Sequence, residues 1–311
     1  MINALSFGWS RRGIVHALAA GFAALFSSPA AAQQISTWSL QPDARVEIGV
    51  VSAETATRDE QIVVNGDALT FRGQVGLDLE DENTRFRLEA DRIEVVRLGE
   101  GRRDTNRDRI TMLVDQEFGD DWEVQVRGRY YDDLVTAESS DTDEIQGSVR
   151  VTYEPVRAHR LRVRGTWRER EYDNRADPQT TGSGLRVDVG YRHRIDRYHY
   201  INFDLRAESI DSADPECGYS RESAKVSYTR PITRDLRIRP ALEVLETRFD
   251  GRLTPDGDRR KDRLIVPELE LHWWPKRWRV EAEAKYIFSD SNLATRQREG
   301  YRLTLTVGYV F

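Results

Sequence analysis

Arginine recurs at alternate positions along several stretches of this 311-residue chain. In residues 161–168, arginine occupies positions 162, 164 and 168, whereas positions 161, 163, 165 and 167 carry Leu, Val, Gly and Trp. Because successive side chains of an extended strand point to opposite faces, this spacing gathers guanidinium groups on one face. Guanidinium presents paired N–H donors that match carboxylate and phosphate oxygens. The chemistry that the spacing predicts is therefore the binding of anions.

Residues suited to acid–base or nucleophilic catalysis are few. The histidines after residue 32 are His159, His193, His199 and His272, all at or near predicted short turns, and no Ser-His-Asp grouping accompanies them. The acidic stretch 139–144 lacks the regular loop pattern of calcium sites. The single cysteine, Cys217, excludes an internal disulfide and is expected to be a spare exposed thiol. We therefore predict that the protein is not an enzyme and holds neither a metal nor a cofactor.

The segments that carry these charges alternate between apolar and polar residues almost to the end of the chain, which is typical of β-strands. Helical periodicity is almost absent after residue 33, and no later stretch has the ~18 apolar residues of a membrane-spanning helix. We predict about fourteen strands, near residues 43–53, 69–80, 84–98, 107–118, 122–134, 143–154, 160–172, 183–194, 199–210, 219–230, 236–249, 262–274, 278–289 and 299–311.

The connections between these strands alternate in length. Long polar connections span residues 54–68, 99–106, 135–142, 173–182, 211–218, 250–261 and 290–298, and shorter turns separate the other strand pairs. This layout is that of an all-β, transmembrane antiparallel up-and-down β-barrel of the outer membrane, with a secreted β-sandwich as the alternative. An even strand number puts both chain ends on the short-turn side, and closure of the last strand on the first leaves no open edge in lipid.

The N-terminus has the features of an export signal. Arg11 and Arg12 precede an apolar stretch at residues 13–26, and small residues follow at 30–32. We expect a cleaved signal peptide at residues 1–32, a short periplasmic segment at 33–42 and the barrel at 43–311, located in the outer membrane with both termini periplasmic. A twin-arginine signal is the less favoured interpretation. The net charge of −6 offers no general basic surface, so nucleic acid is not an expected partner.

Aromatic residues cluster near both ends of the predicted strands, as in the two aromatic girdles of membrane barrels. Near the short turns lie Phe118, Trp122, Tyr153, Tyr191, Tyr200, Tyr228, Trp273, Trp278, Tyr309 and Phe311. Near the long loops lie Tyr130, Trp167, Tyr172, Phe249, Tyr286, Phe288 and Tyr301. Aromatic residues that merely filled a core would not cluster in this way.

The last strand, residues 301–311, ends in an aromatic residue preceded by alternating apolar positions. It resembles the C-terminal signature by which outer-membrane barrels are recognised for assembly, and the resemblance implies that the barrel-assembly machinery reads Leu305, Val307, Tyr309 and Phe311. Residues 289–292, with the polar loop and strand that follow, are loosely similar to barrels of surface-assembly and exopolysaccharide-export outer-membrane proteins. The helical repeats that many such proteins carry before the barrel are missing.

A charge on the lipid face costs ~2–4 kcal/mol near the membrane midplane, so the charged positions of the strands are expected to line the lumen. A basic wall is predicted from Arg127, Arg129, Arg150, Arg162, Arg164, Arg168, Arg186, Arg192, Arg194 and Arg206. A facing, more acidic wall is predicted from Asp78, Glu80, Glu89, Asp115, Glu117, Glu268, Glu270, Glu281 and Glu283.

These walls favour a porin-like channel or export pore for polar or anionic solutes, including polysaccharide. In the alternative, the charges pair across neighbouring strands and rigidify a nearly closed interior. A structural or assembly barrel for a surface polymer or partner remains open, and an outer-membrane lipid-modifying enzyme is the least favoured reading. The expected partners are outer-membrane lipids, the barrel-assembly machinery and anionic saccharides or polysaccharide-export proteins.

Overall fold

The alternating segments form long antiparallel strands. The computed structural model describes residues 38–54, 66–99, 103–136 and 141–311, so the predicted signal peptide lies outside the described residues. The strands are β1 (Ser39–Ala53), β2 (Gly66–Glu80), β3 (Thr84–Arg97), β4 (Thr105–Phe118), β5 (Trp122–Asp132), β6 (Thr142–Val156), β7 (His159–Tyr172), β8 (Thr181–Asp196), β9 (His199–Ser212), β10 (Tyr219–Pro231), β11 (Leu236–Leu253), β12 (Arg259–Trp273), β13 (Trp278–Ser291) and β14 (Arg298–Val310).

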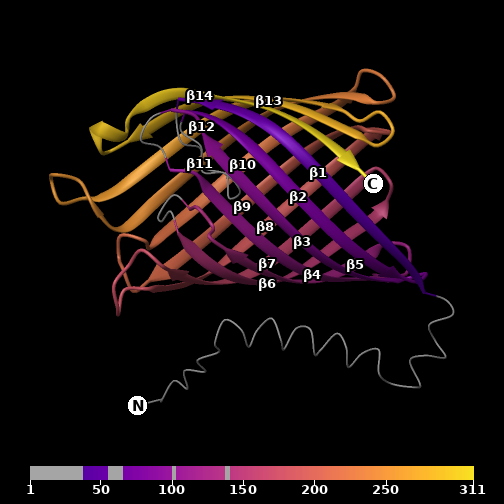
Figure 1. The fold of residues 1–311 in the computed structure, drawn as a ribbon, viewed down its shortest axis with the longest axis horizontal. Helices are drawn as coiled ribbons and strands as arrows, with labels where there is room; N and C mark the ends of the chain where they lie inside the picture. The colour runs from indigo at the N-terminus through magenta and orange to yellow at the C-terminus, as the bar shows by residue number, and fades with distance from the viewer. Residues whose placement is uncertain (1–37, 55–65, 100–102, 137–140) are drawn as a thin grey trace, which may run out of the picture.

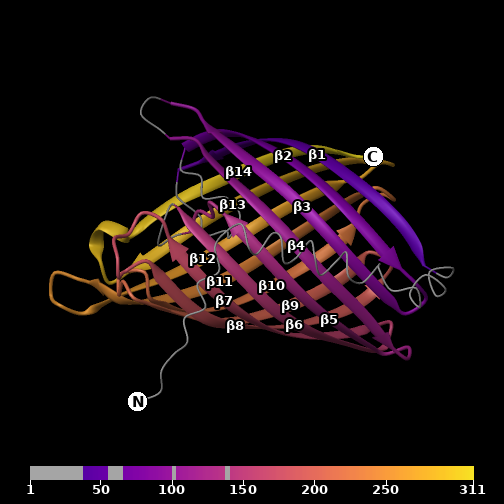
Figure 2. The ribbon, with the colours of Figure 1, turned by 60° about the horizontal axis from the view of Figure 1, so that its bottom comes forward.

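Each strand pairs with its neighbours in sequence, and β14 pairs with β1, so the sheet closes into a barrel (Figures 1 and 2). At the seam Val46 lies opposite Tyr309 and Val50 lies opposite Leu305. Every strand edge is thereby paired, which an apolar membrane interior requires. The prediction of a closed antiparallel barrel of fourteen strands is confirmed for the described part of the chain. The barrel begins at Ser39, four residues before the predicted start at residue 43.

The two ends of the barrel differ in their connections. At one end the turns are short, such as residues 157–158 between β6 and β7 and residues 197–198 between β8 and β9. Tyr198 adopts a φ of 61° in the latter turn, and Gly119 a φ of 63° in the β4–β5 turn. The start of β1 and the C-terminus lie at this short-turn end (Figure 1). The predicted alternation of long loops and short turns is therefore confirmed where the structure describes it.

The outer face of the barrel is apolar. Ile48, Val75 and Leu205 are each more than half exposed although they are aliphatic. Aromatic pairs flank them at the short-turn end, where the rings of Trp122 and Tyr153 stack with centroids 4.3 Å apart. An exposed aliphatic band beside aromatic pairs suits contact with lipid rather than with water. Among the described residues, no helix has the length and apolar character needed to cross a membrane.

Three aromatic residues assigned to the girdles point inward instead, and that part of the prediction is wrong. Phe249 and Tyr172 are fully buried, and Tyr200 lies under the guanidinium of Arg192, 4.3 Å from its ring centroid. The register pairs Phe249 with Tyr219, and both pack with Ile210 inside the barrel near the long loops. The position of a residue along the strand does not choose its face, because the face is set by odd or even spacing from its neighbours.

Candidate functional site

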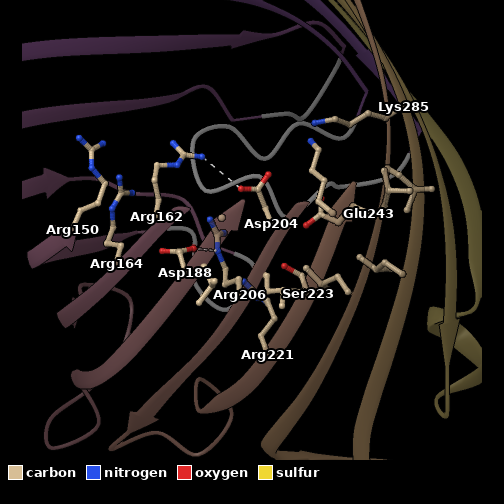
Figure 3. A pocket seen from close by; sticks show the side chains of 18 residues that line it. Arg150, Arg162, Arg164, Asp188, Asp204, Arg206, Arg221, Ser223, Glu243 and Lys285 are labelled. Atoms are coloured by element: carbon tan, nitrogen blue, oxygen red, sulfur yellow. Dashed lines mark hydrogen bonds and ion pairs between the residues drawn. The ribbon is translucent and has the colours of Figure 1, made fainter. Parts of the chain in front are cut away.

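All ten residues of the predicted basic wall fall on the face of the sheet opposite the exposed aliphatic residues. They are Arg127 and Arg129 on β5, Arg150 on β6, Arg162, Arg164 and Arg168 on β7, Arg186, Arg192 and Arg194 on β8, and Arg206 on β9. The register aligns four inward residues, Arg150, Arg164, Asp188 and Arg206, in one row across β6 to β9. Figure 3 shows them converging on a cavity inside the barrel.

Part of this wall is paired with carboxylates. Arg206 Nε donates to Asp188 Oδ1 at 2.7 Å, and Arg162 Nη2 lies 3.6 Å from Asp204 Oδ1. The Arg162–Asp204 pair reaches across Gly190, where a Cβ atom would lie only 2.8 Å from the Asp204 oxygen. Both members of that pair are more than one-third exposed, so their mutual attraction is screened and small.

Other members of the basic wall are held at various strengths. Arg168 donates to Glu208 at 3.0 Å in a fully buried pair. Further contacts to acceptors are Arg150 with Glu123 and Asp115, Arg186 with Asp188 at 3.1 Å, Arg192 with Asn202 at 2.8 Å, and Arg194 with Glu154 at 4.0 Å.

Three arginines have no carboxylate within ion-pair distance among the described residues. Arg127 donates to the side-chain oxygen of Gln125, and Arg129 lies 3.3 Å from the Tyr131 hydroxyl. Arg164 makes no hydrogen bond or ion pair with any described residue, and its Nε is buried without a partner. Because Arg164 also lines the cavity, its guanidinium can be approached by an anion that enters from the lumen.

The predicted acidic wall also faces inward, but most of its charge is neutralised nearby. Asp78 is bound by Arg85 and Arg87, and Glu89 accepts from Arg109 at 2.7 Å. For the other residues of this wall the contacts are Glu80 with Gln41, Asp115 with Arg150 and Gln125, Glu268 with Lys225 and Lys285, Glu270 with Arg239 and His272, Glu281 with His272 and Trp274, and Glu283 with Lys285; Glu117 lies opposite Glu123.

The cavity has a volume of about 500 Å³. Of the predicted basic wall it is lined by Arg150, Arg162, Arg164 and Arg206, and none of the nine predicted acidic residues reaches it. Three further cations complete the lining, Arg221, Lys225 and Lys285. Its carboxylates are Asp188, Asp204 and Glu243, so seven cations meet three carboxylates around one space. Four of these cations also pair with carboxylates outside the lining, namely Arg150 with Glu123, Arg221 with Glu208, and Lys225 and Lys285 with Glu268. The lining residues themselves still carry more positive than negative charge, which favours anions in a partly desolvated site.

Sequence reasoning missed one side of this cavity. Its lining includes the aliphatic residues Leu245, Leu264, Val266 and Ile287 of β11 to β13. The signal was present in the alternation, since Leu264 and Val266 share odd–even spacing with the inward-facing Glu268. A rule that assigned all aliphatic side chains to lipid overlooked them. It likewise overlooked the inward aliphatic cluster Val51, Ala53, Ala68, Ile93 and Val95.

The single cysteine and a group of three aspartates lie outside the cavity lining. Cys217, expected to be exposed, is fully buried in the β9–β10 loop, where Arg175 Nη2 lies 3.6 Å from its sulfur. Burial raises the pKa of this thiol above its ordinary value. At the same end of the barrel, carboxylate oxygens of Asp133, Asp143 and Asp173 approach within 4.8 Å of one another.

Comparison with known proteins finds likeness of fold but no related sequence. No protein-family model matches the sequence, and no curated protein matches it significantly. Among solved structures, OmpT of Vibrio cholerae gives a TM-score of 0.56 at 8% identity, covering 89% of this chain and 98% of that one. A bacterial polysaccharide outer membrane secretin gives 0.51 at 10% identity, with coverages of 86% and 98%. An anion-selective porin from Comamonas acidovorans gives 0.50 at 8% identity, with coverages of 88% and 100%.

These likenesses confirm that the chain has the fold of a Gram-negative outer-membrane β-barrel, and the similarity to export barrels is supported as well. The prediction that the protein is not an enzyme is wrong as a flat exclusion. The barrels of similar fold include OmpT, an outer membrane protein, besides channels and porins. The fold therefore gives no ground for excluding an enzymatic activity. A shared fold at 8% identity neither assigns nor excludes an enzyme.

Proposed function

We propose that the protein is an outer-membrane channel that passes small anionic solutes through the lumen. The observation that carries the proposal is Arg164, whose guanidinium lines the cavity without a hydrogen bond or ion pair to any described residue. Around it the lining has seven cations and three carboxylates, and four of those cations pair with carboxylates outside the lining. Inward-facing Arg and Lys side chains are the feature by which anion pores select their solutes.

The pattern of ion pairs supports a site that an anion occupies transiently rather than permanently. Both side chains of the Arg162–Asp204 pair are more than one-third exposed and 3.6 Å apart, so the contribution of the pair to stability is of the order of 0–1 kcal/mol. An incoming anion therefore competes with this pair readily. Conduction requires binding that is favourable enough to admit a solute and weak enough to release it. On strand β7, Arg164 has no carboxylate partner among the described residues, and Arg162 has one that an anion can displace.

We extend the proposal to orientation and assembly. The start of β1 and the C-terminus share the short-turn end, which suits the arrangement in which both termini are periplasmic. Leu305, Val307, Tyr309 and Phe311 alternate along the last strand, and the register pairs Val307 and Leu305 with the outward-facing Ile48 and Val50. Their reading by the barrel-assembly machinery stays a prediction of the resemblance.

The test replaces the two arginines and measures ion selectivity. Purified protein is reconstituted in planar bilayers, and the reversal potential is recorded across a potassium chloride gradient. We expect the wild type to prefer chloride, and the double variant Arg162→Ser/Arg164→Ser to lose most of that preference because both guanidinium charges are gone.

The matched control is Arg162→Lys/Arg164→Lys, which keeps both charges and is expected to keep the preference. A wild type that does not conduct would instead support the rigid interior closed by ion pairs. Unchanged selectivity in the serine variant would remove these arginines from the pathway.

A further inference from the structure

The cavity is two-sided in chemical character. Leu245 and Leu264 face each other in the register of β11 and β12, and Val266 and Ile287 join them in the cavity lining. Leu264 and Val266 are only half-buried, so their side chains remain accessible from the lumen. Aliphatic side chains that border an interior space gain free energy when an apolar surface covers them.

The guanidinium groups stand on the other side of the same cavity. Arg150, Arg162 and Arg164 belong to β6 and β7, and three strands, β8 to β10, separate them from the aliphatic residues. In Figure 3 these arginines lie together at one side, and Lys285 and Glu243 lie at the other. A molecule within the cavity would therefore meet the arginines on one side, and on the other the four aliphatic side chains beside Lys285 and Glu243.

We propose that the solute is a small organic anion with an apolar body, such as an aromatic or short aliphatic carboxylate, and not a hydroxylated saccharide. This inference rests on the proposed function and narrows its substrate class. The carboxylate would pair with the open guanidinium of Arg164, and the apolar body would cover Leu264 and Val266. A cavity of about 500 Å³ lies within the range of small-molecule sites.

The aliphatic side argues against a sugar for a physical reason. A hydroxyl group placed against Leu264, Val266 or Ile287 would lose hydrogen bonds to water, and these three side chains offer no donor or acceptor in return. Each such unpaired hydroxyl costs free energy, whereas an aromatic ring or alkyl chain has no such loss. The same guanidinium groups would attract both kinds of anion, so the aliphatic residues are what discriminate between them.

The experiment compares benzoate with gluconate, which carry the same charge but differ in the polarity of their bodies. Each is added to protein in planar bilayers, and the concentration that halves the chloride current is measured. Equilibrium dialysis of both anions against detergent-solubilised protein gives their binding independently of conductance. We expect benzoate to act at a concentration at least tenfold lower than gluconate in both measurements.

The variant Leu264→Asn/Val266→Thr is expected to bring the two anions within about threefold of each other, because the apolar body of benzoate then loses its aliphatic contact. The control is Leu113→Asn, which alters an inward aliphatic residue of β4 outside the cavity lining and should preserve the preference. Equal action of benzoate and gluconate on a chloride-selective wild type overturns this inference and leaves the proposed function standing. If the wild type shows no chloride selectivity but binds benzoate preferentially, the proposed channel function is overturned and the inferred binding site is retained.

Discussion

Arg164 and Arg168 lie on the same face of β7 and meet different surroundings. Arg168 is fully buried and donates to Glu208, which also accepts from Arg221 at 2.8 Å and Tyr219 at 3.3 Å. Arg164 has no such partner among the described residues. The same residue type therefore stabilises the barrel at one position and is open to a solute at the other. The difference follows from the number of acceptors within reach.

The first prediction at the residue scale compares these two arginines. Arg168→Gln removes a buried charge-assisted contact and should lower the free energy of unfolding by about 1–3 kcal/mol. Arg164→Gln should leave that free energy unchanged or raise it, because it relieves repulsion without breaking a contact. Urea unfolding in lipid vesicles, followed by tryptophan fluorescence, measures both. Equal destabilisation by the two substitutions would contradict the distinction drawn here.

At the scale of the strand, β7 shows why single steps in sequence matter. Val163 is 42% exposed on the outer face, and its neighbour Arg164 lines the cavity. A shift of one residue in register would exchange these environments for the whole strand. The alternation was readable in advance, and all strands occur within a few residues of their predicted positions. The ends were less accurate, as with β11, which continues to Leu253 rather than to residue 249.

The second prediction tests which face meets lipid. Val163→Arg places a charge on the outer face near the middle of β7 and should cost about 2–4 kcal/mol of unfolding free energy in vesicles. Ser223→Arg adds the same side chain to the lumen, where Ser223 already lines the cavity, and should cost much less. Unfolding titrations of the two variants under identical lipid conditions decide the matter. A larger cost for the lumenal substitution would reverse the assignment of faces.

At the scale of the whole molecule, the outer face of the barrel carries a broad aliphatic band and the inner face carries the charges of the two predicted walls. Leu185 on β8 is 61% exposed, whereas Arg186 beside it is buried. This arrangement is the inverse of a water-soluble protein, where exposed aliphatic bands of this extent cause association. Its stability depends on the medium around the barrel as much as on the contacts inside it.

The third prediction concerns that medium. The purified chain should stay folded and dispersed in detergent or lipid, and should aggregate when detergent is removed, because the outer band then faces water. Sedimentation together with far-ultraviolet circular dichroism measures both properties. A folded monomer in plain buffer would be incompatible with a membrane barrel.

The sequence by itself determined the strand number, the closed barrel and the inward direction of the two charged walls, because a period of two assigns each side chain to a face. Only the tertiary structure decided which charges are satisfied. Arg87 reaches Asp43 of β1 and Asp78 of β2, and closure brings Leu264 and Arg164 to one cavity from strands five apart in order. Such contacts depend on register and on reach across a curved wall, and periodicity along one strand carries no information about either.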